Sequence, residues 1–292
     1  MDTVLERLPS GARVAVIRLR SLGDCVLTTP ALVLLKRHRP DLRIDVVVEP
    51  RWAAVFEGNP DVDEIRSGAG RADLALNLHG GTRSMMLTAA CRAGIRAGFA
   101  HHRYSFFYSV KIPTAQEILG VSRRVHTAEH LASAVFFLGV PKTEIPGAKL
   151  FAAAPPDLPP YAVIHPFASA PEKTWPAERF VAVAGHLRER LGLEPVFVAG
   201  LDDDPSAFSG FRIWRNEPLA RVKSLLAGAQ LFLGNDSGPA HVAAAFGVPV
   251  VALFGASDPE TWAPWRTEAQ ALTGSITVES VISAVESLKV RA

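Results

Sequence analysis

The turn at residues 234–239, Gly-Asn-Asp-Ser-Gly-Pro, is the segment of this sequence best suited to bind an anion. An apolar run that starts at Leu231 precedes it, and a small-residue stretch and a second apolar run, ending at Phe254, follow it. This order predicts a strand, a tight turn, a short helix and a second strand. Parallel strands joined in this way place the turn at the carboxyl end of the first strand, beside the free N–H groups of the helix. A phosphate group is the ligand that such a turn would hold.

The residue types around the turn also fit a helix start without any ligand. Pro239 suits the first helical turn, because its missing N–H would have no partner within the helix. Ser237 or Asp236 can cap the neighbouring N–H groups. An ordinary capped helix in an α/β domain therefore stays an alternative to a phosphate site.

Length and composition indicate two domains. The chain has 292 residues, of which 48% are hydrophobic, enough for two packed cores of about 150 residues each. We find no apolar run near the roughly 20 residues that span a bilayer, and the first residues lack the apolar segment of a signal peptide. We therefore expect a cytoplasmic protein. Cys25 and Cys91 are the only cysteines, too few for a disulfide framework, and no spacing of cysteine and histidine suggests a zinc site.

The first half of the chain alternates between β-rich and helical segments, which is typical of a doubly wound α/β domain. Expected strands lie at 13–19, 43–48, 62–65 and 74–78, and expected helices lie at 25–40, 52–57, behind 79–84, and at 126–138. The first loop has neither the Gly-x-Gly-x-x-Gly pattern of dinucleotide-binding proteins nor the Walker lysine pattern. Nicotinamide enzymes and P-loop nucleotidases are therefore not supported, and we expect no cofactor.

Four prolines in six residues interrupt the alternation at 155–160 and predict a linker, because proline fits neither a helix interior nor a central strand. The alternation then restarts. Expected strands lie at 161–165 and 195–199, and expected helices lie at 177–191, 219–227 and 277–290. We predict an amino-terminal domain at 1–151, a linker at 152–160, a second doubly wound domain at 161–275 and a carboxyl-terminal helix at 276–292.

The charge is unevenly divided between the halves. Lys and Arg outnumber Asp and Glu by 20 to 14 in residues 1–150, a net +6, whereas the remaining residues carry 11 against 15, a net −4. An anionic partner on the first half fits this division, although a split of this size also occurs without function. Nucleic acid is a poor candidate, because the positive excess is modest and no DNA-binding or RNA-binding motif is present.

Three motifs in order along most of the chain resemble the ADP-heptose:lipopolysaccharide heptosyltransferase family, inverting glycosyltransferases of the two-domain GT-B fold. The motifs are Arg-Leu-Arg-Ser-Leu-Gly-Asp at 18–24, His165-Pro166 with Lys-Thr-Trp-Pro at 173–176, and Asn-Asp-Ser-Gly-Pro-Ala-His at 235–241 with Phe-Gly-Ala-Ser-Asp-Pro at 254–259. The resemblance implies two Rossmann-like domains facing across a cleft, one for the acceptor and one for the nucleotide sugar.

By this resemblance Asp24 is the general base that takes a proton from the acceptor hydroxyl, giving inversion by direct displacement. A positioned base typically contributes about 10²- to 10⁴-fold in rate. Its place at the carboxyl end of a strand, beside Gly23, suits a residue that meets a ligand. Asp24 is also a suitable N-cap for the following helix, where the helix dipole would make it a weaker base.

The resemblance assigns the donor diphosphate to Lys173, Ser169, Ser237, Gly238 and His241, whose positive charge and hydrogen-bond donors would stabilise the leaving group. Lys173 could instead be a solvated loop lysine, and His241 could be a structural helix residue. The loop at 167–170 has fewer hydroxyl groups than the phosphate loops of the family, and the chain is shorter than typical members. These departures concern the acceptor and the donor sugar more than the fold.

Acidic residues of the second half have other expected roles. Asp236 would accept hydrogen bonds from sugar hydroxyls, because a carboxylate repels a diphosphate. The run Asp202-Asp203-Asp204 suggests Mg²⁺, but a solvated acidic turn before Pro205 is the more common meaning, and the family does not depend on a metal. Asp202 could hold the ribose hydroxyls. We expect no metal site.

The acceptor would contact the first domain through Arg20, Gly81, Arg83 and Arg103, since arginine binds sugar phosphates in a bidentate manner. Arg123 and Arg124 join Arg103 as candidates for peripheral contact with the inner face of the inner membrane. The sequence thus predicts a metal-independent, inverting glycosyltransferase that moves heptose or a related sugar from ADP-heptose to a lipopolysaccharide-core or other surface-glycan acceptor. A GT-B nucleotide-sugar epimerase and a non-catalytic nucleotide-sugar-binding protein are the alternatives.

Overall fold

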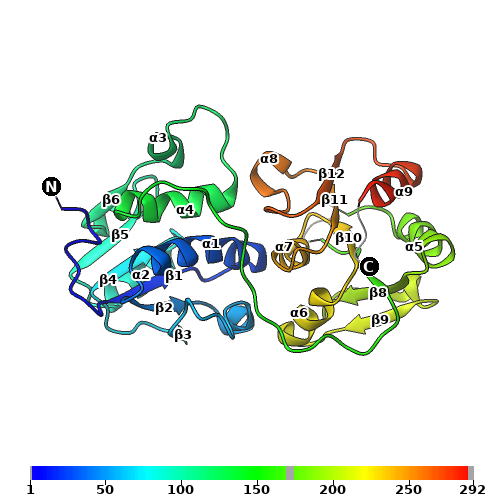
Figure 1. Ribbon diagram of the computed structural model, residues 1–292, viewed down its shortest axis with the longest axis horizontal. Helices are drawn as coiled ribbons and strands as arrows, with labels where there is room; N and C mark the ends of the chain where they lie inside the picture. Colours follow the sequence, from blue (N-terminus) through cyan, green and yellow to red (C-terminus); the bar gives the residue numbers. More distant parts are fainter. Residues whose placement is uncertain (1, 169–173, 289–292) are drawn as a thin grey trace. The chain divides into compact units, whose positions relative to one another are not determined.

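The computed structural model describes residues 2–168 and 174–288. The chain divides into two units, residues 1–151 and 152–292. Each unit contains one six-stranded parallel sheet among the described residues. Figure 1 colours the first unit from blue to green and the second from green to red. The division falls at the start of the proline-rich stretch, and residues 140–160 form neither helix nor strand.

The first unit follows the expected alternation of strands and helices. Its elements are β1 (Arg13–Ile17), α1 (Leu22–His38), β2 (Arg43–Val47), η1 (Pro50–Val55), β3 (Glu64–Arg66), β4 (Leu74–Asn77), α2 (Thr82–Ala90), β5 (Ile95–Phe99), η2 (Ser105–Phe107), β6 (Val110–Ile112), α3 (Ala115–Leu119) and α4 (Thr127–Leu138). The strand order is β3-β2-β1-β4-β5-β6. The order reverses between β1 and β4, so the loops that follow these two strands diverge and leave room for a ligand.

The central strands are mostly apolar because their residues are buried on both faces of the sheet. Strand β4 is buried along its whole length, and the last four residues of β1 and β2 are buried, as expected for parallel strands with both faces covered. Helix α1 packs against α4. Pro30 lies inside α1 and cannot donate to the carbonyl of Val26. The hydroxyl of Thr29 donates to that carbonyl instead, at 2.8 Å.

The second unit repeats the same plan. Its elements are β7 (Tyr161–His165), α5 (Ala177–Leu191), β8 (Glu194–Ala199), η4 (Ser206–Phe208), β9 (Arg212–Arg215), α6 (Leu219–Ala227), β10 (Leu231–Asn235), α7 (Gly238–Ala245), β11 (Val250–Phe254), α8 (Pro259–Trp262), β12 (Ala269–Thr273) and α9 (Val278–Ser287). The strand order is β12-β11-β10-β7-β8-β9, which reverses between β7 and β10. The expected α/β class with two doubly wound sheets is confirmed.

Helix α9 belongs to the core of the second unit. Figure 1 shows it beside α5, and the two helices are in contact. Val281 and Val285 of α9 pack into the same buried cluster as Phe180 of α5 and Leu231 of β10. The last helix therefore covers one face of the second sheet.

Several local expectations need correction. The segment expected as a helix at 52–57 is a 3-10 helix that begins at Pro50, and the strand expected at 62–65 lies at Glu64–Arg66. Strands β5, β6, β9 and β12 were not expected, because they are short, lie toward the sheet edges and include exposed or half-buried positions. An edge strand with half-buried residues lacks the continuous apolar run by which the central strands are recognised.

Candidate functional sites

Asp24 lies in the first turn of α1, at the switch point of the first sheet. Helix α1 begins at Leu22 with Ser21 as its N-cap, so Asp24 is the third helical residue, and the expectation that it caps the helix as N-cap is wrong. Its carboxylate does take part in a capping box, because Oδ2 accepts hydrogen bonds from the backbone N–H and the hydroxyl of Ser21, at 3.2 and 3.0 Å. The carboxylate is held in place from the amino-terminal side.

Arg18, the residue that follows β1, holds the other oxygen of this carboxylate. Its Nη2 forms an ion pair with Oδ1 of Asp24, and its Nη1 donates a hydrogen bond to the carbonyl of Leu78 after β4. The side chains of Arg18 and Asp24 are only 12% and 16% exposed. Arg18 therefore ties together the ends of β1 and β4 and fixes the direction in which Asp24 points.

Glu49 and His79 follow β2 and β4, the strands on either side of β1. Glu49 follows β2 and pairs with Arg83 at 3.2 Å, so the charge of Arg83, which was expected to meet the acceptor, already has a carboxylate partner. His79 follows β4, and its Nδ1 is buried without a partner among the described residues. Burial lowers the pKa of His79, and the positive charges of Arg18 and Arg20 lower it further. His79 is therefore a neutral ring beside an ion pair at pH 7.

The neighbouring loop contributes a group of stacked rings. His130 of α4 stacks on Phe99 at 4.1 Å between ring centroids, and His101 stacks on the same ring at 5.4 Å. His102 packs edge-on and contacts the hydroxyl of Tyr108 through Nδ1 at 3.2 Å. Burial lowers the pKa of both His102 and His130 to about 4, and the positive charge of neighbouring rings adds to the effect.

The other expected acceptor residues have distinct places. Gly81 is the N-cap of α2, and Gly80 before it has φ +83°. A Cβ at Gly80 would lie 2.6 Å from the ring of His102, so the close approach of the two loops requires glycine there. Arg20 and Arg103 are exposed, and the guanidinium of Arg103 lies over the ring of Tyr104 at 5.5 Å.

The switch point of the second sheet is lined by neutral groups. Nδ1 of His165, the last residue of β7, lies 3.1 Å from the hydroxyl of Ser237, the N-cap of α7. The expectation that Ser237 caps the helix through its side chain is wrong, because that hydroxyl makes no capping hydrogen bond and contacts His165 instead. Burial lowers the pKa of His165 to about 4. The ring is neutral at pH 7 and binds the ends of β7 and β10 together.

Asn235, the last residue of β10, is completely buried and forms a second link across this switch point. Its Oδ1 accepts from the N–H of Trp175 at 3.1 Å, and its Nδ2 donates to the carbonyl of Pro166 at 2.7 Å. The loop from β7 to α5, which contains the expected phosphate-binding residues, is therefore fixed at both ends to a single side chain.

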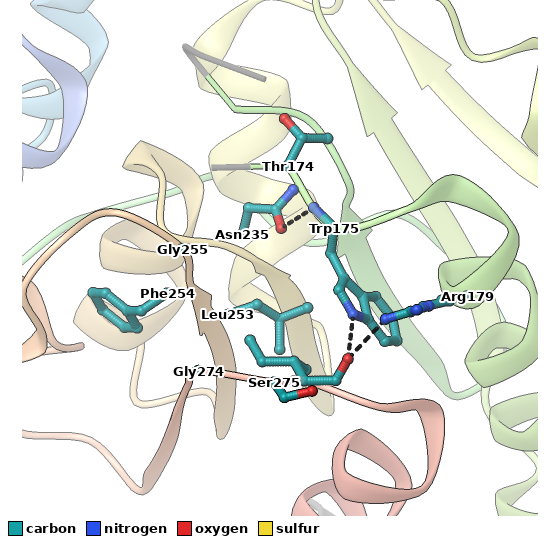
Figure 2. A pocket seen from close by; sticks show the side chains of 10 residues that line it. Thr174, Trp175, Arg179, Asn235, Leu253, Phe254, Gly255, Gly274 and Ser275 are labelled. Carbon is teal, nitrogen blue, oxygen red and sulfur yellow. Dashed lines mark hydrogen bonds between the residues drawn. The ribbon is translucent and has the colours of Figure 1, made fainter. Parts of the chain in front are cut away.

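A pocket of about 240 Å³ opens beside this junction. It lies at the carboxyl ends of β10 and β11 and the start of α5, and its lining residues are Thr174, Trp175, Arg179, Asn235, Leu253, Phe254, Gly255, Gly274, Ser275 and Ile276. In Figure 2 the indole of Trp175 and the guanidinium of Arg179 lie side by side, and both donate to the carbonyl of Ile276, at 3.1 and 2.9 Å. The polar groups of this wall are therefore engaged in holding α5 to the segment after β12.

The expected donor residues have different outcomes. Lys173 and Ser169 lie outside the described residues. Gly238 is the first residue of α7, as expected, and Asp236 is half-buried, with its N–H bonded to the carbonyl of Leu253 at 2.9 Å. His241 lies one turn inside α7, is 4% exposed and faces the ring of Trp262 at 6.5 Å. The helix start and its flanking side chains are thus close together.

The acidic run at 202–204 lies in an irregular segment between β8 and η4. Asp203 accepts a hydrogen bond from the N–H of Gly200 at 2.6 Å and Asp204 accepts one from Ser206 at 3.0 Å, while Asp202 is exposed. Within residues 2–168 and 174–288 no group of three or more His, Cys, Asp or Glu residues is arranged to hold a metal ion. Over the same described ranges, no helix is both long and apolar enough to span a bilayer.

Sequence reasoning assigned no role to the residues that fix these sites. Arg18, His165 and Asn235 lie within the motifs that carry the resemblance, but their types alone do not show which partner each one contacts. The position of these three residues in the sequence was the feature that could have indicated their importance. All three lie at or just after the carboxyl end of a central strand, which is where an open α/β sheet binds its ligands.

Comparisons with known proteins agree with this geometry. The model of the family described as glycosyltransferase family 9 (heptosyltransferase) matches residues 66–284. The chain is 27% identical to lipopolysaccharide heptosyltransferase 3 of Escherichia coli over 299 residues, covering 85% of this chain and 84% of that one. A glycosyl transferase family 9 structure from Veillonella parvula superposes with a TM-score of 0.83 at 26% identity, covering 94% of this chain and 96% of the other.

The structure of E. coli heptosyltransferase WaaC with ADP superposes with a TM-score of 0.79, covering 94% of this chain and 99% of that one. At 20% identity this likeness concerns the fold. The fold class expected from the resemblance, GT-B with two Rossmann-like domains, is confirmed.

Proposed function

We propose that this chain, which belongs to glycosyltransferase family 9, the heptosyltransferases, transfers heptose from ADP-heptose to a lipopolysaccharide-core acceptor. The similarity to lipopolysaccharide heptosyltransferases supports the sugar and the acceptor class. One observation carries the proposal: the carboxylate of Asp24 lies at the switch point of the first sheet, held by Arg18 and Ser21. A fixed carboxylate at this place is suited to receive the proton of an attacking hydroxyl.

Asp24 is proposed as the general base. A carboxylate has about four lone-pair positions, and the three contacts to Arg18 and Ser21 leave one of them for a further hydrogen bond. An acceptor hydroxyl that donates there would be oriented before the reaction starts. The hydroxyl oxygen then attacks the anomeric carbon as the bond to the diphosphate breaks and the proton passes to Asp24.

The donor would be held by the second unit. The N–H groups at the start of α7 and the hydroxyl of Ser237 are suited to the diphosphate, because a helix start attracts anions. Gly238 lets a phosphate approach the backbone closely. Lys173, Ser169 and His241 are proposed to assist there, and Asp236 and Asp202 are proposed to accept hydrogen bonds from sugar and ribose hydroxyls. The N–H groups of the helix start, together with the hydroxyl groups and positive charge beside them, would stabilise the charge that develops on the leaving group.

The course of the reaction follows from this assignment. Direct attack by a hydroxyl that Asp24 activates inverts the configuration at the anomeric carbon. A reaction that first forms a bond to a second nucleophile, or in which the hydroxyl attacks from the same face as the leaving group, retains the configuration. The proton coupling constants of the purified product distinguish the two. We also propose that no metal is needed, which predicts equal turnover with and without EDTA.

The first unit is proposed to hold the acceptor through Arg20, Arg103 and Gly81. Arg83 would take part only by exchanging its partner Glu49 for an acceptor phosphate. We propose that the protein works on the cytoplasmic side of lipopolysaccharide assembly and touches the membrane without spanning it.

The test is a transfer assay with purified protein, ADP-heptose and a truncated lipopolysaccharide core, with the product identified by mass spectrometry. The proposal predicts a product heavier by one heptose and the release of ADP. Conversion of the donor in the absence of acceptor would indicate an epimerase instead. Donor binding by calorimetry without turnover on any core acceptor would indicate a binding protein and overturn the proposal.

A further inference from the structure

A long segment of the first unit contains no acidic residue. Between Asp73 and Glu117 the sequence has five cations and neither Asp nor Glu. The cations are Arg83, Arg92, Arg96, Arg103 and Lys111. Arg83 pairs with Glu49, whereas the other four form no ion pair with a described residue. This segment, which runs from β4 to the start of α3, therefore carries a positive charge that the described part of the molecule does not neutralise locally.

The same segment exposes aromatic side chains. Phe106 is 69% exposed and Phe107 is 39% exposed, and their rings lie 4.6 Å apart. The ring centroid of Tyr104 lies 6.4 Å from that of Phe106, and the guanidinium of Arg103 lies over the Tyr104 ring, 5.5 Å from its centroid. We call residues 103–107 the aromatic loop. A phenylalanine so exposed loses the favourable free energy of burial, which is about 2 kcal/mol for a large apolar side chain.

The exposure of these rings is built into the loop. Tyr108, the next residue, is buried against Gly98, where a Cβ would lie 2.4 Å from its ring. Arg96 donates from Nε to the carbonyl of Phe107 at 3.0 Å. The buried ring of Tyr108 and the hydrogen bond from Arg96 fix the backbone of the loop, so Phe106 and Phe107 stay at the surface.

The aromatic loop also reaches the proposed acceptor site. The hydroxyl of Tyr104 lies 2.9 Å from the hydroxyl of Thr82, the first residue of α2 after the loop that contains Gly81. An acceptor that carries a lipid would therefore meet the aromatic loop and the end of β4 together. This step rests on the proposed function.

We propose that the aromatic loop binds the surface of an anionic lipid bilayer, with Phe106 and Phe107 entering the interface and Arg103 and Lys111 meeting the headgroups. Aromatic rings favour the membrane interface, and cations near an anionic surface each strengthen binding about fivefold. The lack of acidic residues over 43 positions, 74–116, fits a surface that binds a negatively charged partner. Single apolar anchors bind weakly, so the combination of rings and cations is required.

This assignment differs from the sequence-based expectation for the membrane contact. Arg123 forms hydrogen bonds through both terminal nitrogens to the carboxylate of Glu129, at 2.8 and 2.6 Å. Its charge is therefore neutralised within the first unit. Of the basic group expected from sequence, at Arg103, Arg123 and Arg124, the proposal keeps Arg103 and adds the exposed rings and Lys111.

Co-sedimentation of the full chain with vesicles tests the proposal. Vesicles of phosphatidylethanolamine and phosphatidylglycerol should bind the protein, and vesicles of phosphatidylcholine alone should bind it at least tenfold more weakly. The double variant Phe106→Ser and Phe107→Ser should lose at least tenfold in binding to the anionic vesicles. Leu201→Ser is the matched control, because Leu201 is 65% exposed but lies in the second unit, and its binding should not change.

A charge variant and an activity measurement complete the test. Lys111→Gln should weaken binding to anionic vesicles about fivefold, and added salt should weaken binding of the wild-type chain. The double phenylalanine variant should keep its turnover on a delipidated, water-soluble core acceptor, so a failure of membrane binding is distinguishable from a failure of the proposed activity. Equal binding by wild type and both variants, or no binding of wild type to anionic vesicles, would overturn the proposal.

Discussion

The two switch points share one topology and differ in charge. In the first unit, after β1 and β4, an arginine and a carboxylate form an ion pair that is only 12% and 16% exposed. In the second unit, after β7 and β10, His165, Ser237 and Asn235 connect the strands through neutral hydrogen bonds. The comparison teaches that one fold can prepare two kinds of site. A fixed charge suits proton transfer, and neutral donors beside a helix start suit an anionic ligand.

The largest expected effect is on the charged side of this comparison. Asp24→Asn keeps the shape and most hydrogen bonds of the side chain but cannot take up a proton. We predict that kcat falls about 10²- to 10⁴-fold while the affinity for ADP-heptose, measured by calorimetry, stays unchanged. Asp157→Asn, an exposed carboxylate of the linker, is the control and should keep full activity. Turnover of Asp24→Asn near that of wild type would remove Asp24 from the mechanism.

A stability effect is expected on the neutral side. Asn235→Leu leaves the N–H of Trp175 and the carbonyl of Pro166 without their partner, and each unsatisfied buried group costs about 1–3 kcal/mol. We predict a lower free energy of unfolding in urea and weaker binding of ADP. Asn235→Asp should lose at least as much, because it still accepts from Trp175 but places a carboxylate oxygen against the carbonyl of Pro166 at a completely buried position. A variant as stable as wild type would show that the junction does not hold the loop.

The ion pair itself can be broken at Arg18. Arg18→Met removes the partner of Asp24 and the hydrogen bond to the carbonyl of Leu78, so we predict a fall in kcat of about 10- to 100-fold. Arg18→Lys keeps the positive charge beside Asp24 and should lose less in kcat than Arg18→Met. Equal losses in the two variants would show that the charge of Arg18 does not support the carboxylate of Asp24.

Acid should affect the first unit more than the second. His102 and His130 have a pKa of about 4 in the folded chain and about 6.5 when unfolded, and the pKa of His79 is also lowered, whereas in the second unit the pKa of His165 is about 4. Below pH 6.5 the unfolded chain binds more protons, so His102, His130 and His165 each lower the stability by up to about 1.4 kcal/mol per pH unit until about pH 4, and His79 acts in the same direction.

Hydrogen exchange in the whole chain, corrected for the intrinsic rate at each pH, measures this difference. From pH 7 to pH 5 we predict that β1 and β4 lose more protection than β7 and β10. His130→Phe, which keeps the stacking on Phe99, should reduce the loss in the first unit, and the exposed His38→Gln should not. Equal losses in both units would contradict the burial of the first-unit histidines.

Much of the fold follows from the sequence, because the central strands are long apolar runs that end at polar loops. The predicted bounds of β7, α5 and α6 match the structure, and the resemblance to the heptosyltransferases is confirmed by the family match. Strands such as β6 and β12 could not be predicted, because three to five residues with exposed positions depend on a neighbouring strand for their conformation.

The site was predictable in its positions but not in its contacts. The motifs placed Asp24 and the turn at 234–239 at strand ends, where ligands bind. The partners come from elsewhere in the chain: Arg18 donates to Leu78, 60 residues away, and Ser237 contacts His165, 72 residues away. Tertiary packing decides which of several potential partners a side chain contacts. Periodicity and residue type carry no information about that packing.

Hydrogen exchange with ligands added one at a time tests the division between the two switch points most directly. ADP should protect residues 235–241 and leave residues 18–24 unchanged, and a core acceptor added alone should protect 18–24 and leave 235–241 unchanged. Protection of 18–24 by ADP, with 235–241 unaffected, would contradict the assignment of the donor to the neutral site and the acceptor to the charged one.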